Sequence, residues 1–292
     1  MCRTVTPSIM DPLKSDPTSK ISRRVKQGLE CSWIIREEKK QALIVHDPAI
    51  PVVYGIPKTH KPDIPLRPIV SGPKHPAFLL AELLLESFSA LGIHFPHVVS
   101  NSFEIKTELS SYVNADNISL ASFDVKDMYP SIPIQLAISE LKTWLHQKKL
   151  SPLEIHEYVS LTELVLHNNF FQFEHEYIHQ ADGLAMGNPL SPFLANLVLN
   201  FLETKILKEH RFRFVRLFRY ADDCLVLFKH EDTLHELFNE LNASYHSINY
   251  VMDKETDGKL HYLDLTIYRH INKFVTTVYR KQDSGDLYIH SS

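Results

Sequence analysis

The sequence predicts an α+β fold in which a small antiparallel sheet is backed by helices. Apolar residues recur at helical spacing in some stretches and alternate in others. Their order along the chain is strand, helix, helical insert, hairpin, helix and strand, which is the β-α-β-β-α-β plan. With 292 residues and 44% hydrophobic side chains, the chain can form one large core or two subdomains.

The N-terminal part of the chain carries the weakest pattern. Residues 1–20 are polar and show no apolar periodicity, so we expect a disordered or truncated lead-in. Residues 21–46 are expected to hold a helix and a strand at 42–45. No run of about 18 apolar residues and no secretory leader pattern occurs, so we expect no membrane partner.

Two proline-containing strands follow, at residues 52–61 and 66–71, with a turn at 62–65 between them. Proline lacks the N–H group that an inner strand needs on both sides. We therefore expect a two-stranded basic flap at the edge of a sheet.

The middle of the chain is mostly helical. Ser151, Pro152 and Glu154 form a capping-box pattern that predicts the start of one helix. The expected elements are helices at 76–91, 102–112 and 134–150, another from 151, a strand at 118–125, a hairpin at 170–180, a loop at 181–190 and a helix from 191.

The C-terminal part is expected to contain a hairpin, a helix and a final pair of strands. The hairpin occupies residues 214–228, and an amphipathic helix follows through residues 234–241. The last strand of the plan is expected at 263–268, paired with residues 274–280 across Asn272 and Lys273.

Two adjacent acids, Asp222 and Asp223, interrupt the apolar run of the 214–228 hairpin. We expect them at its tip, in a tight turn over residues 221–223. Two carboxylates about 4 Å apart repel by roughly 1 kcal/mol in water and more when partly buried. A compensating Mg²⁺ fits this pair, because it binds through one or two carboxylates and substrate phosphates. The alternative is an exposed Asp-Asp turn on a surface hairpin.

Asp124 lies near the end of the strand expected at 118–125. In the predicted plan this strand neighbours the middle hairpin, so Asp124, Asp222 and Asp223 are expected to converge at one sheet edge. Three carboxylates there suit two Mg²⁺ ions about 3.5–4 Å apart. Successive strand residues face opposite ways, so we favour Asp222 as the fuller ligand, with Asp223 assisting from the turn.

The net charge of −4 is by itself a mild argument against a nucleic-acid partner, but the charge is unevenly distributed. Residues 54–76 carry four cations against one acid, and residues 205–219 carry six against one. These clusters suit a phosphate backbone, and a solvated surface is the alternative. Three widely spaced cysteines indicate a reducing compartment and no disulfide framework.

Several motifs carry a resemblance to reverse transcriptases. Phe-Asp-Val-x-x-x-Tyr-x-x-Ile-Pro at 123–133, Asp-Gly-Leu-Ala-Met-Gly-Asn-Pro-Leu-Ser-Pro-Phe-Leu-Ala-Asn at 182–196 and Arg-Tyr-Ala-Asp-Asp at 219–223 resemble motifs A, B and C. Residues 54–61 and 65–71 resemble the two fingers motifs, and 262–269 the strand after motif D. The forms at 54–61, 185–192 and 278–281 are similar to those of Penelope-like retroelements; a telomerase-like enzyme fits the fingers motifs less well.

The resemblance implies a right-hand polymerase with fingers and palm and with the thumb largely absent. The implied domains are a partly disordered lead-in at 1–45, fingers at 46–115, a palm at 116–282 with a helical insert at about 134–200, and a truncated start of the thumb at 283–292. The implied activity is RNA-directed DNA polymerisation, adding dNMP to a primer 3′-OH on an RNA template with two Mg²⁺ ions, for which Mn²⁺ can substitute.

Site roles follow from the same resemblance. The metals would be held by Asp124, Asp222, Asp223 and the Val125 carbonyl. The nucleotide would be bound by Lys58, Arg67, Tyr129, Met186 and Gly187. The template and primer would be contacted by Lys61, Gly183, Pro189 and Tyr220. A proton for the pyrophosphate would come from Lys254 or Lys259.

Some of these roles have a structural alternative. Tyr129 would exclude a ribose 2′-OH, or it is simply a core tyrosine near a turn. Lys58 and Arg67 would grip phosphate, Arg with a bidentate fork, or they belong to a solvated flap. Lys254 and Lys259 would otherwise be ordinary surface lysines.

The sequence departs from the common family pattern at Met186, Asn188 and Ala221, where Gln, Ser and Val are more usual, but no required charge is lost. The expected partners are RNA template, DNA primer and dNTPs, and the expected location is nuclear, otherwise cytoplasmic. The oligomeric state is left open. One alternative is a decayed or domesticated element that binds nucleic acid without polymerising; another is an RNA-templated RNA polymerase.

Overall fold

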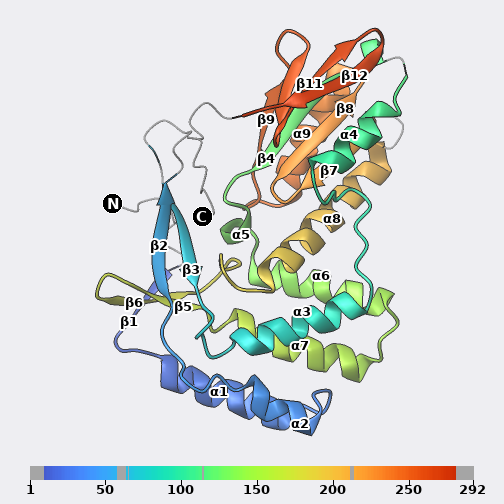
Figure 1. The fold of residues 1–292 in the computed structure, drawn as a ribbon. Helices are drawn as coiled ribbons and strands as arrows, with labels where there is room; N and C mark the ends of the chain where they lie inside the picture. Colours follow the sequence, from blue (N-terminus) through green and yellow to red (C-terminus); the bar gives the residue numbers. More distant parts are fainter. Residues whose placement is uncertain (1–9, 58–63, 65, 114, 211–213, 281–292) are drawn as a thin grey trace, which may run out of the picture. The chain divides into compact units, whose positions relative to one another are not determined.

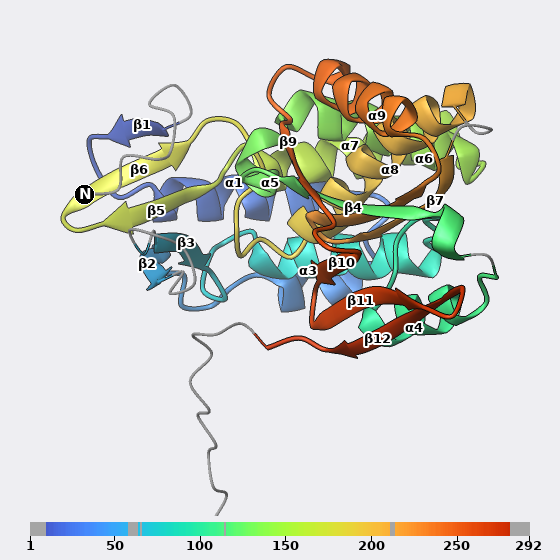
Figure 2. The ribbon, with the colours of Figure 1, turned by 90° about the horizontal axis from the view of Figure 1, so that it is seen from above.

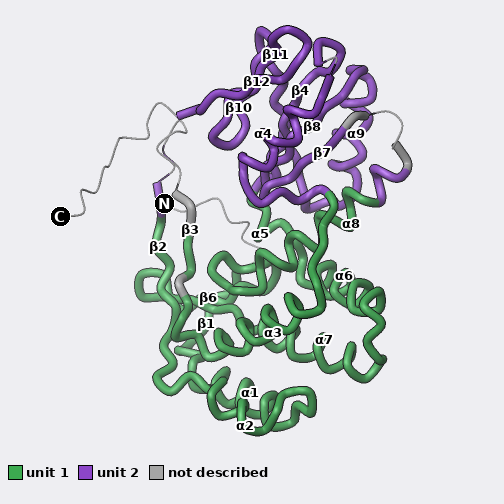
Figure 3. The backbone as a smooth tube through the Cα atoms, turned by 45° about the vertical axis from the view of Figure 1, so that its right-hand side comes forward, with its two compact units in different colours: residues 1–55, 68–96, 127–204 green, residues 56–67, 97–126, 205–292 purple. Residues whose placement is uncertain are grey.

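The computed structural model describes residues 10–57, 64, 66–113, 115–210 and 214–280. The chain forms two compact units, each built from three separate stretches (Figure 3). Unit 1 comprises residues 1–55, 68–96 and 127–204, and unit 2 comprises residues 56–67, 97–126 and 205–292. None of the helices in the described ranges is long and apolar enough to cross a membrane.

Unit 2 contains a four-stranded antiparallel sheet, called here the central sheet. Its strands are β4 (Ser119–Val125), β7 (Phe214–Tyr220), β8 (Asp223–Phe228) and β9 (Tyr250–Lys254), in the order β7-β8-β4-β9. This order completes the β-α-β-β-α-β plan with α9 (Glu231–Ser244) before the last strand. The sequence placed that last strand at 263–268, which was wrong: β9 pairs with β4.

Both faces of the central sheet are covered within unit 2. The helix α9 lies on one face, where Phe238 contacts Phe123 with ring centroids 5.5 Å apart. The other face packs against α4 (Ser102–Ser110) and a three-stranded sheet of β10 (Lys259–Tyr262), β11 (Leu265–His270) and β12 (Lys273–Val278), and Figure 2 shows these layers in succession. The expected pairing of β11 with β12 is confirmed.

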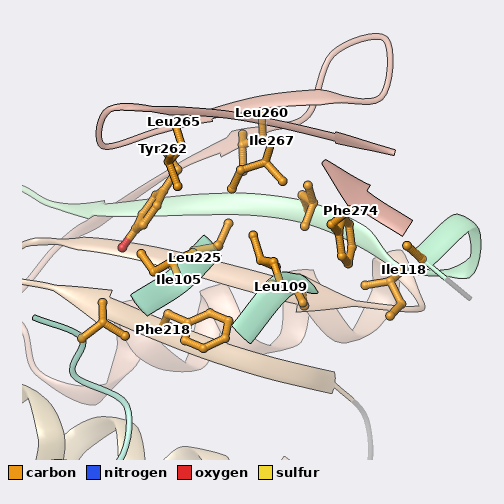
Figure 4. Close-up of a cluster of buried hydrophobic side chains, with 14 residues drawn as sticks. Ile105, Leu109, Ile118, Phe218, Leu225, Leu260, Tyr262, Leu265, Ile267 and Phe274 are labelled. Atoms are coloured by element: carbon orange, nitrogen blue, oxygen red, sulfur yellow. The ribbon is translucent and has the colours of Figure 1, made fainter. Parts of the chain in front are cut away.

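A buried cluster joins this second face to its cover (Figure 4). Leu225 and Phe218 from the central sheet lie with Leu109 of α4 and Ile267 of β11 in that cluster. Because each strand has one side chain in two on this face, the cluster fixes which face every residue of β4 and β8 presents.

Most of a five-stranded sheet and most of the remaining helices belong to unit 1, and the sheet's strands and the helices are labelled in Figure 1. The strands are β1 (Met10–Leu13), β2 (Val52–Pro57), β3 (Leu66–Ser71), β5 (Phe170–Phe173) and β6 (Glu176–Gln180), in the order β1-β6-β5-β2-β3. The pair β2 and β3 therefore forms one end of this sheet, as expected, but only β3 is an edge strand, because β2 lies between β5 and β3. The expectation of a disordered lead-in was wrong for residues 10–20, because β1 pairs with β6 and a helix begins at Thr18.

The helices of this part are α1 (Thr18–Cys31), α2 (Glu37–Lys40), α3 (Phe78–Ala90), α5 (Met128–Ser131), α6 (Ile134–Gln147), α7 (Pro152–Leu166) and α8 (Ser191–His210), and α8 continues beyond unit 1. The capping box at Ser151 is confirmed. The strand expected at 42–45 is not formed, since the 3-10 turn η1 (Gln41–Leu43) occupies that position. In unit 2, a second short 3-10 turn, η2 (Ala115–Asn117), precedes β4.

His75 links the segment after β3 to the start of β5. Its Nδ1 accepts a hydrogen bond from the Ala77 N–H at 3.1 Å, and its Nε2 lies 2.9 Å from the Asn168 carbonyl. The ring also packs on Phe170, with centroids 4.8 Å apart. Burial lowers the pKa of His75 to about 4, so the neutral ring donates from Nε2.

We expect the stability of the chain to depend on pH through His75. The unfolded side chain titrates near its ordinary value, so between that value and pH 4 the unfolded state binds the extra proton. This contribution is complete at neutral pH and is lost as the pH falls toward about 4, with a limit of about 3 kcal/mol. Urea unfolding from pH 7 to 4.5 should show a shallower loss of stability for His75→Gln than for the wild type. Parallel curves for the two proteins would contradict the assignment.

Candidate active site

Two carboxylates lie opposite each other on neighbouring strands of the central sheet. Asp124 of β4 pairs in register with Asp223, the first residue of β8. The Val125 N–H donates to the Asp222 carbonyl at 3.0 Å, which makes Asp124 and Asp223 a non-hydrogen-bonded pair. Cβ atoms in such pairs are about 4.5–5.5 Å apart. Both side chains are half-buried, so two like charges lie close together away from full solvent.

The third acid lies in the turn between β7 and β8. This turn has two residues, Ala221 and Asp222, and is closed by the pair Tyr220 and Asp223. Ala221 has φ 52°, the left-handed conformation that a two-residue hairpin with the sheet's twist requires at its first position. The sequence placed Asp223 in the turn and favoured Asp222 as the fuller ligand. The register instead puts Asp223 on the strand, because the turn is one residue shorter than expected.

This set of oxygens suits a hard divalent cation. Like charges directly opposite each other destabilise a sheet, and a cation between Asp124 and Asp223 offsets their repulsion. Among the residues that the structure describes, no group of three or more His, Cys, Asp or Glu side chains is arranged to hold a metal by itself. The pair therefore matches an ion such as Mg²⁺, which takes its remaining ligands from substrate phosphates and water.

A tyrosine side chain bonds to the backbone of the acid pair. The Tyr262 hydroxyl donates to the Asp223 carbonyl at 2.8 Å. Burial, with Cys224 and Asp223 nearby, raises the pKa of Tyr262, so the hydroxyl remains a donor.

Lys254 pairs in register with Ala121 and so lies on the face opposite Asp124. It forms an ion pair with Glu231 at 2.6 Å, which favours a surface role.

The cations at 205–219 do not form one surface. Arg219 is fully buried, and Arg216 lies 3.7 Å from Glu108. Lys205 and Lys208 are exposed on α8. Arg211 and Arg213 lie outside the described residues. The expected phosphate-binding patch is therefore divided between buried and exposed positions.

The basic flap is described only in part. Lys58 and Lys61 lie outside the described residues, and Arg67 is on β3 with its side chain outside the description. Lys74 is ion-paired with Asp47 at 2.6 Å, with both side chains exposed. The expected phosphate contacts of Lys58, Lys61 and Arg67 stay predictions.

In unit 1, the loop at 181–190 is bound to the short helix α5. The Leu184 N–H donates to the Tyr129 carbonyl at 2.9 Å. Gly183 has φ +79°, and a Cβ built there would lie 2.6 Å from the Pro130 carbonyl oxygen. Gly183 is therefore required by this backbone contact, whatever its role toward a template. Tyr129 is half-buried, and its role at the sugar stays a prediction.

Two residues that fix this loop were missed by sequence reasoning. The Asp182 carboxylate accepts from the Ile134 N–H and from the Gly183 N–H, both at 2.8 Å, and so joins the loop to the start of α6. The Ser191 hydroxyl donates to the Ala185 carbonyl at 2.6 Å. The Asp-Gly pair itself was the available signal for a turn of this kind.

The same loop is attached to the flap strand β3. The Val70 N–H donates to the Met186 carbonyl at 3.2 Å. Met186, Gly187 and Pro189 line a small pocket together with residues that include His75. Three of the residues expected to bind nucleotide or template thus lie together in unit 1.

The structure is similar to solved polymerases. It matches apo telomerase of Candida tropicalis truncated from the C-terminal domain with a TM-score of 0.58 and 13% identity, over 80% of this chain and 56% of that chain. Telomerase of Candida albicans in complex with a TWJ fragment of telomeric RNA matches with 0.59 and 9%, over 92% and 54%. The BmCPV RNA-dependent RNA polymerase matches with 0.53 and 13%, over 86% and 26%. The chain thus spans just over half the length of these two telomerases.

These likenesses define the class of fold as the fingers and palm of a right-hand polymerase. The model of the reverse transcriptase (RNA-dependent DNA polymerase) family matches residues 61–255, about two thirds of the sequence, and the chain belongs to that family. A search of curated protein sequences gives no significant match.

Replacement of Gly183 by alanine should destabilise the chain. The added Cβ would strain the left-handed backbone and clash with Pro130, and we expect a loss of about 2 kcal/mol or more in the free energy of unfolding. Gly72→Ala is the matched control in the same unit, because its Cβ would have only ordinary contacts, with His75 Cβ at 3.4 Å. Equal urea midpoints for the two variants would refute a structural requirement at Gly183.

Proposed function

We propose that the chain is the RNA-directed DNA polymerase of a Penelope-like retroelement, and that it adds dNMP to a primer 3′-OH on an RNA template. The observation that carries the proposal is the Asp124–Asp223 pair, with Asp222 in the adjoining turn, in a member of the reverse transcriptase family. The Penelope-like assignment is supported by the motif forms at 54–61, 185–192 and 278–281.

Asp124, Asp222, Asp223 and the Val125 carbonyl would hold two Mg²⁺ ions, or Mn²⁺ in their place. When bound, these ions supply charge neutralisation at the phosphates and acidify the attacking hydroxyl. The register of β4 and β8 sets the spacing of the two strand carboxylates before any substrate binds. The Tyr262 hydrogen bond holds the Asp223 backbone in that register.

The remaining contacts would be divided between the nucleotide and the nucleic acid. Tyr129, Met186 and Gly187 would position the nucleotide, and Lys58 with Arg67 would neutralise its phosphates. The template and primer would lie against Lys61, Gly183, Pro189 and Tyr220. The last of these is 41% exposed beside the acid pair. We further propose fingers at 46–115, a palm at 116–282 and a nuclear location.

The polymerase proposal predicts that activity depends on the acids. Primer extension with dTTP on poly(rA)/oligo(dT) should be detected for the wild type in Mg²⁺. Asp124→Asn and Asp222→Asn should each lower it by about 100-fold or more, because the amide removes a charge needed to hold a cation. Asp232→Asn, an exposed acid at the start of α9, should retain wild-type activity.

Two results would contradict this assignment. Equal, background-level extension by the wild type and Asp222→Asn, with RNA binding retained, would favour a decayed element that only binds nucleic acid. A preference of the wild type for NTPs would favour an RNA polymerase.

Tyr129→Ala should relax sugar selection. If the ring occupies the space of a 2′-OH, its removal should raise incorporation of NTPs relative to dNTPs on the order of tenfold or more. Tyr177→Ala, another half-buried tyrosine of unit 1, is the control and should leave the ratio unchanged. An unchanged ratio in Tyr129→Ala would support the core-tyrosine alternative.

A further inference from the structure

Arg219 immediately precedes the hairpin tip that carries the acids, and it is fully buried, with 0% of its surface exposed. It is among the largest fully buried side chains in the described part of the chain. A guanidinium keeps its charge in proteins, and burying a charge costs several kcal/mol unless acceptors compensate it. Arg219 therefore cannot act as part of an exposed basic surface, and its buried charge needs another explanation.

The main chain of Arg219 is fixed on both sides. Its N–H donates to the His97 carbonyl at 2.7 Å, and its carbonyl accepts from the Val99 N–H at 2.9 Å. These bonds form a parallel bridge outside the central sheet at Val98. On the other side, Arg219 pairs in register with Cys224, next to Asp223.

The guanidinium reaches the turn itself. Nη1 of Arg219 donates to the Ala221 carbonyl at 3.2 Å. This carbonyl belongs to the peptide group that joins Ala221 to Asp222, so the bond limits how that peptide can rotate. Ala221 is in the left-handed conformation, which costs an L-residue roughly 1–2 kcal/mol. A strained turn persists only where its surroundings hold it.

The conformation of this turn also determines where the Asp222 backbone lies relative to Asp124 of β4. The Asp222 carbonyl accepts from the Val125 N–H at 3.0 Å, one residue after Asp124. The Asp222 carbonyl lies in the peptide group that follows this turn, so a change in the backbone conformation of the turn that displaces Asp222 would weaken this bond and disturb the pairing of Asp124 with Asp223.

We propose that Arg219 is a positioning residue: its buried guanidinium holds the strained Ala221–Asp222 turn and thereby keeps the three carboxylates arranged for a divalent cation. The functional part of this inference rests on the proposed polymerase site. The holding of the turn can be tested apart from polymerisation.

The first test is hydrogen exchange of the turn. Arg219→Lys keeps the charge but has a shorter reach and lacks the planar fork, so amides in residues 217–226 should exchange several-fold faster. Arg216→Lys on the same strand is the control and should leave that region protected, because Arg216 lies near Glu108 instead. Unchanged protection in Arg219→Lys, or equal loss in both variants, would overturn the proposal.

The second test is binding of Mn²⁺ alone, followed by electron paramagnetic resonance. Arg219→Lys should bind Mn²⁺ about tenfold more weakly than the wild type, as for other residues that orient ligands. Adding Ala221→Gly should restore part of the affinity, because glycine adopts the turn without strain. Wild-type affinity in Arg219→Lys would overturn the proposal, as would no recovery in the double variant.

The two kinds of failure are distinguishable. Absence of Mn²⁺ binding and primer extension in the wild type would refute the proposed function, while hydrogen exchange would still decide whether Arg219 holds the turn. Wild-type Mn²⁺ binding that is lost in Asp124→Asn but kept in Arg219→Lys would preserve the metal site and refute the role of Arg219.

Discussion

The constraint on which unit 2 depends is the placement of two like charges at directly opposed positions of one sheet. The separation of Asp124 and Asp223 is determined by the hydrogen-bonded ladder between β4 and β8. That ladder is held from both faces, by α9 on one and by the buried cluster around Leu225 on the other. The hydrophobic core thus opposes the electrostatic repulsion between the two strand carboxylates. Apolar packing and charge placement cannot be treated as independent features here.

Much of this arrangement could be predicted from local sequence, because the determinants are local. The apolar runs on either side of the two acids at 214–228 predicted the hairpin, and the helices were predicted from their apolar spacing and from the cap at Ser151. The strand β9 was missed, since its five residues lack alternation and their partner lies far away in β4. The strand β1 was missed for the same reason. Register is also long-range information, and so the sequence placed Asp223 in the turn, although it is the first residue of β8.

In unit 1, the loop at 181–190 shows why some unusual residues are compatible with the family. Its described attachments to Tyr129, Pro130 and Val70 involve main-chain atoms. The Met186 side chain takes no part in the bond to Val70, which uses the Met186 carbonyl. A change of side chain at such a position leaves the attachment in place. Glycine at 183 is different, because there the backbone of Pro130 occupies the space of any Cβ.

Charge patterns are where sequence reasoning reached its physical limit. Arg216 and Arg219 are three residues apart on one strand and look equivalent in a count of cations. Three residues along a strand bring a side chain to the opposite face, so the two must meet different surroundings. One is half-exposed beside Glu108, and the other is enclosed and bonded to the Ala221 carbonyl. The group of cations that suggested phosphate binding thus includes Arg219, whose guanidinium is buried and bonds to the backbone of the turn that carries the acids.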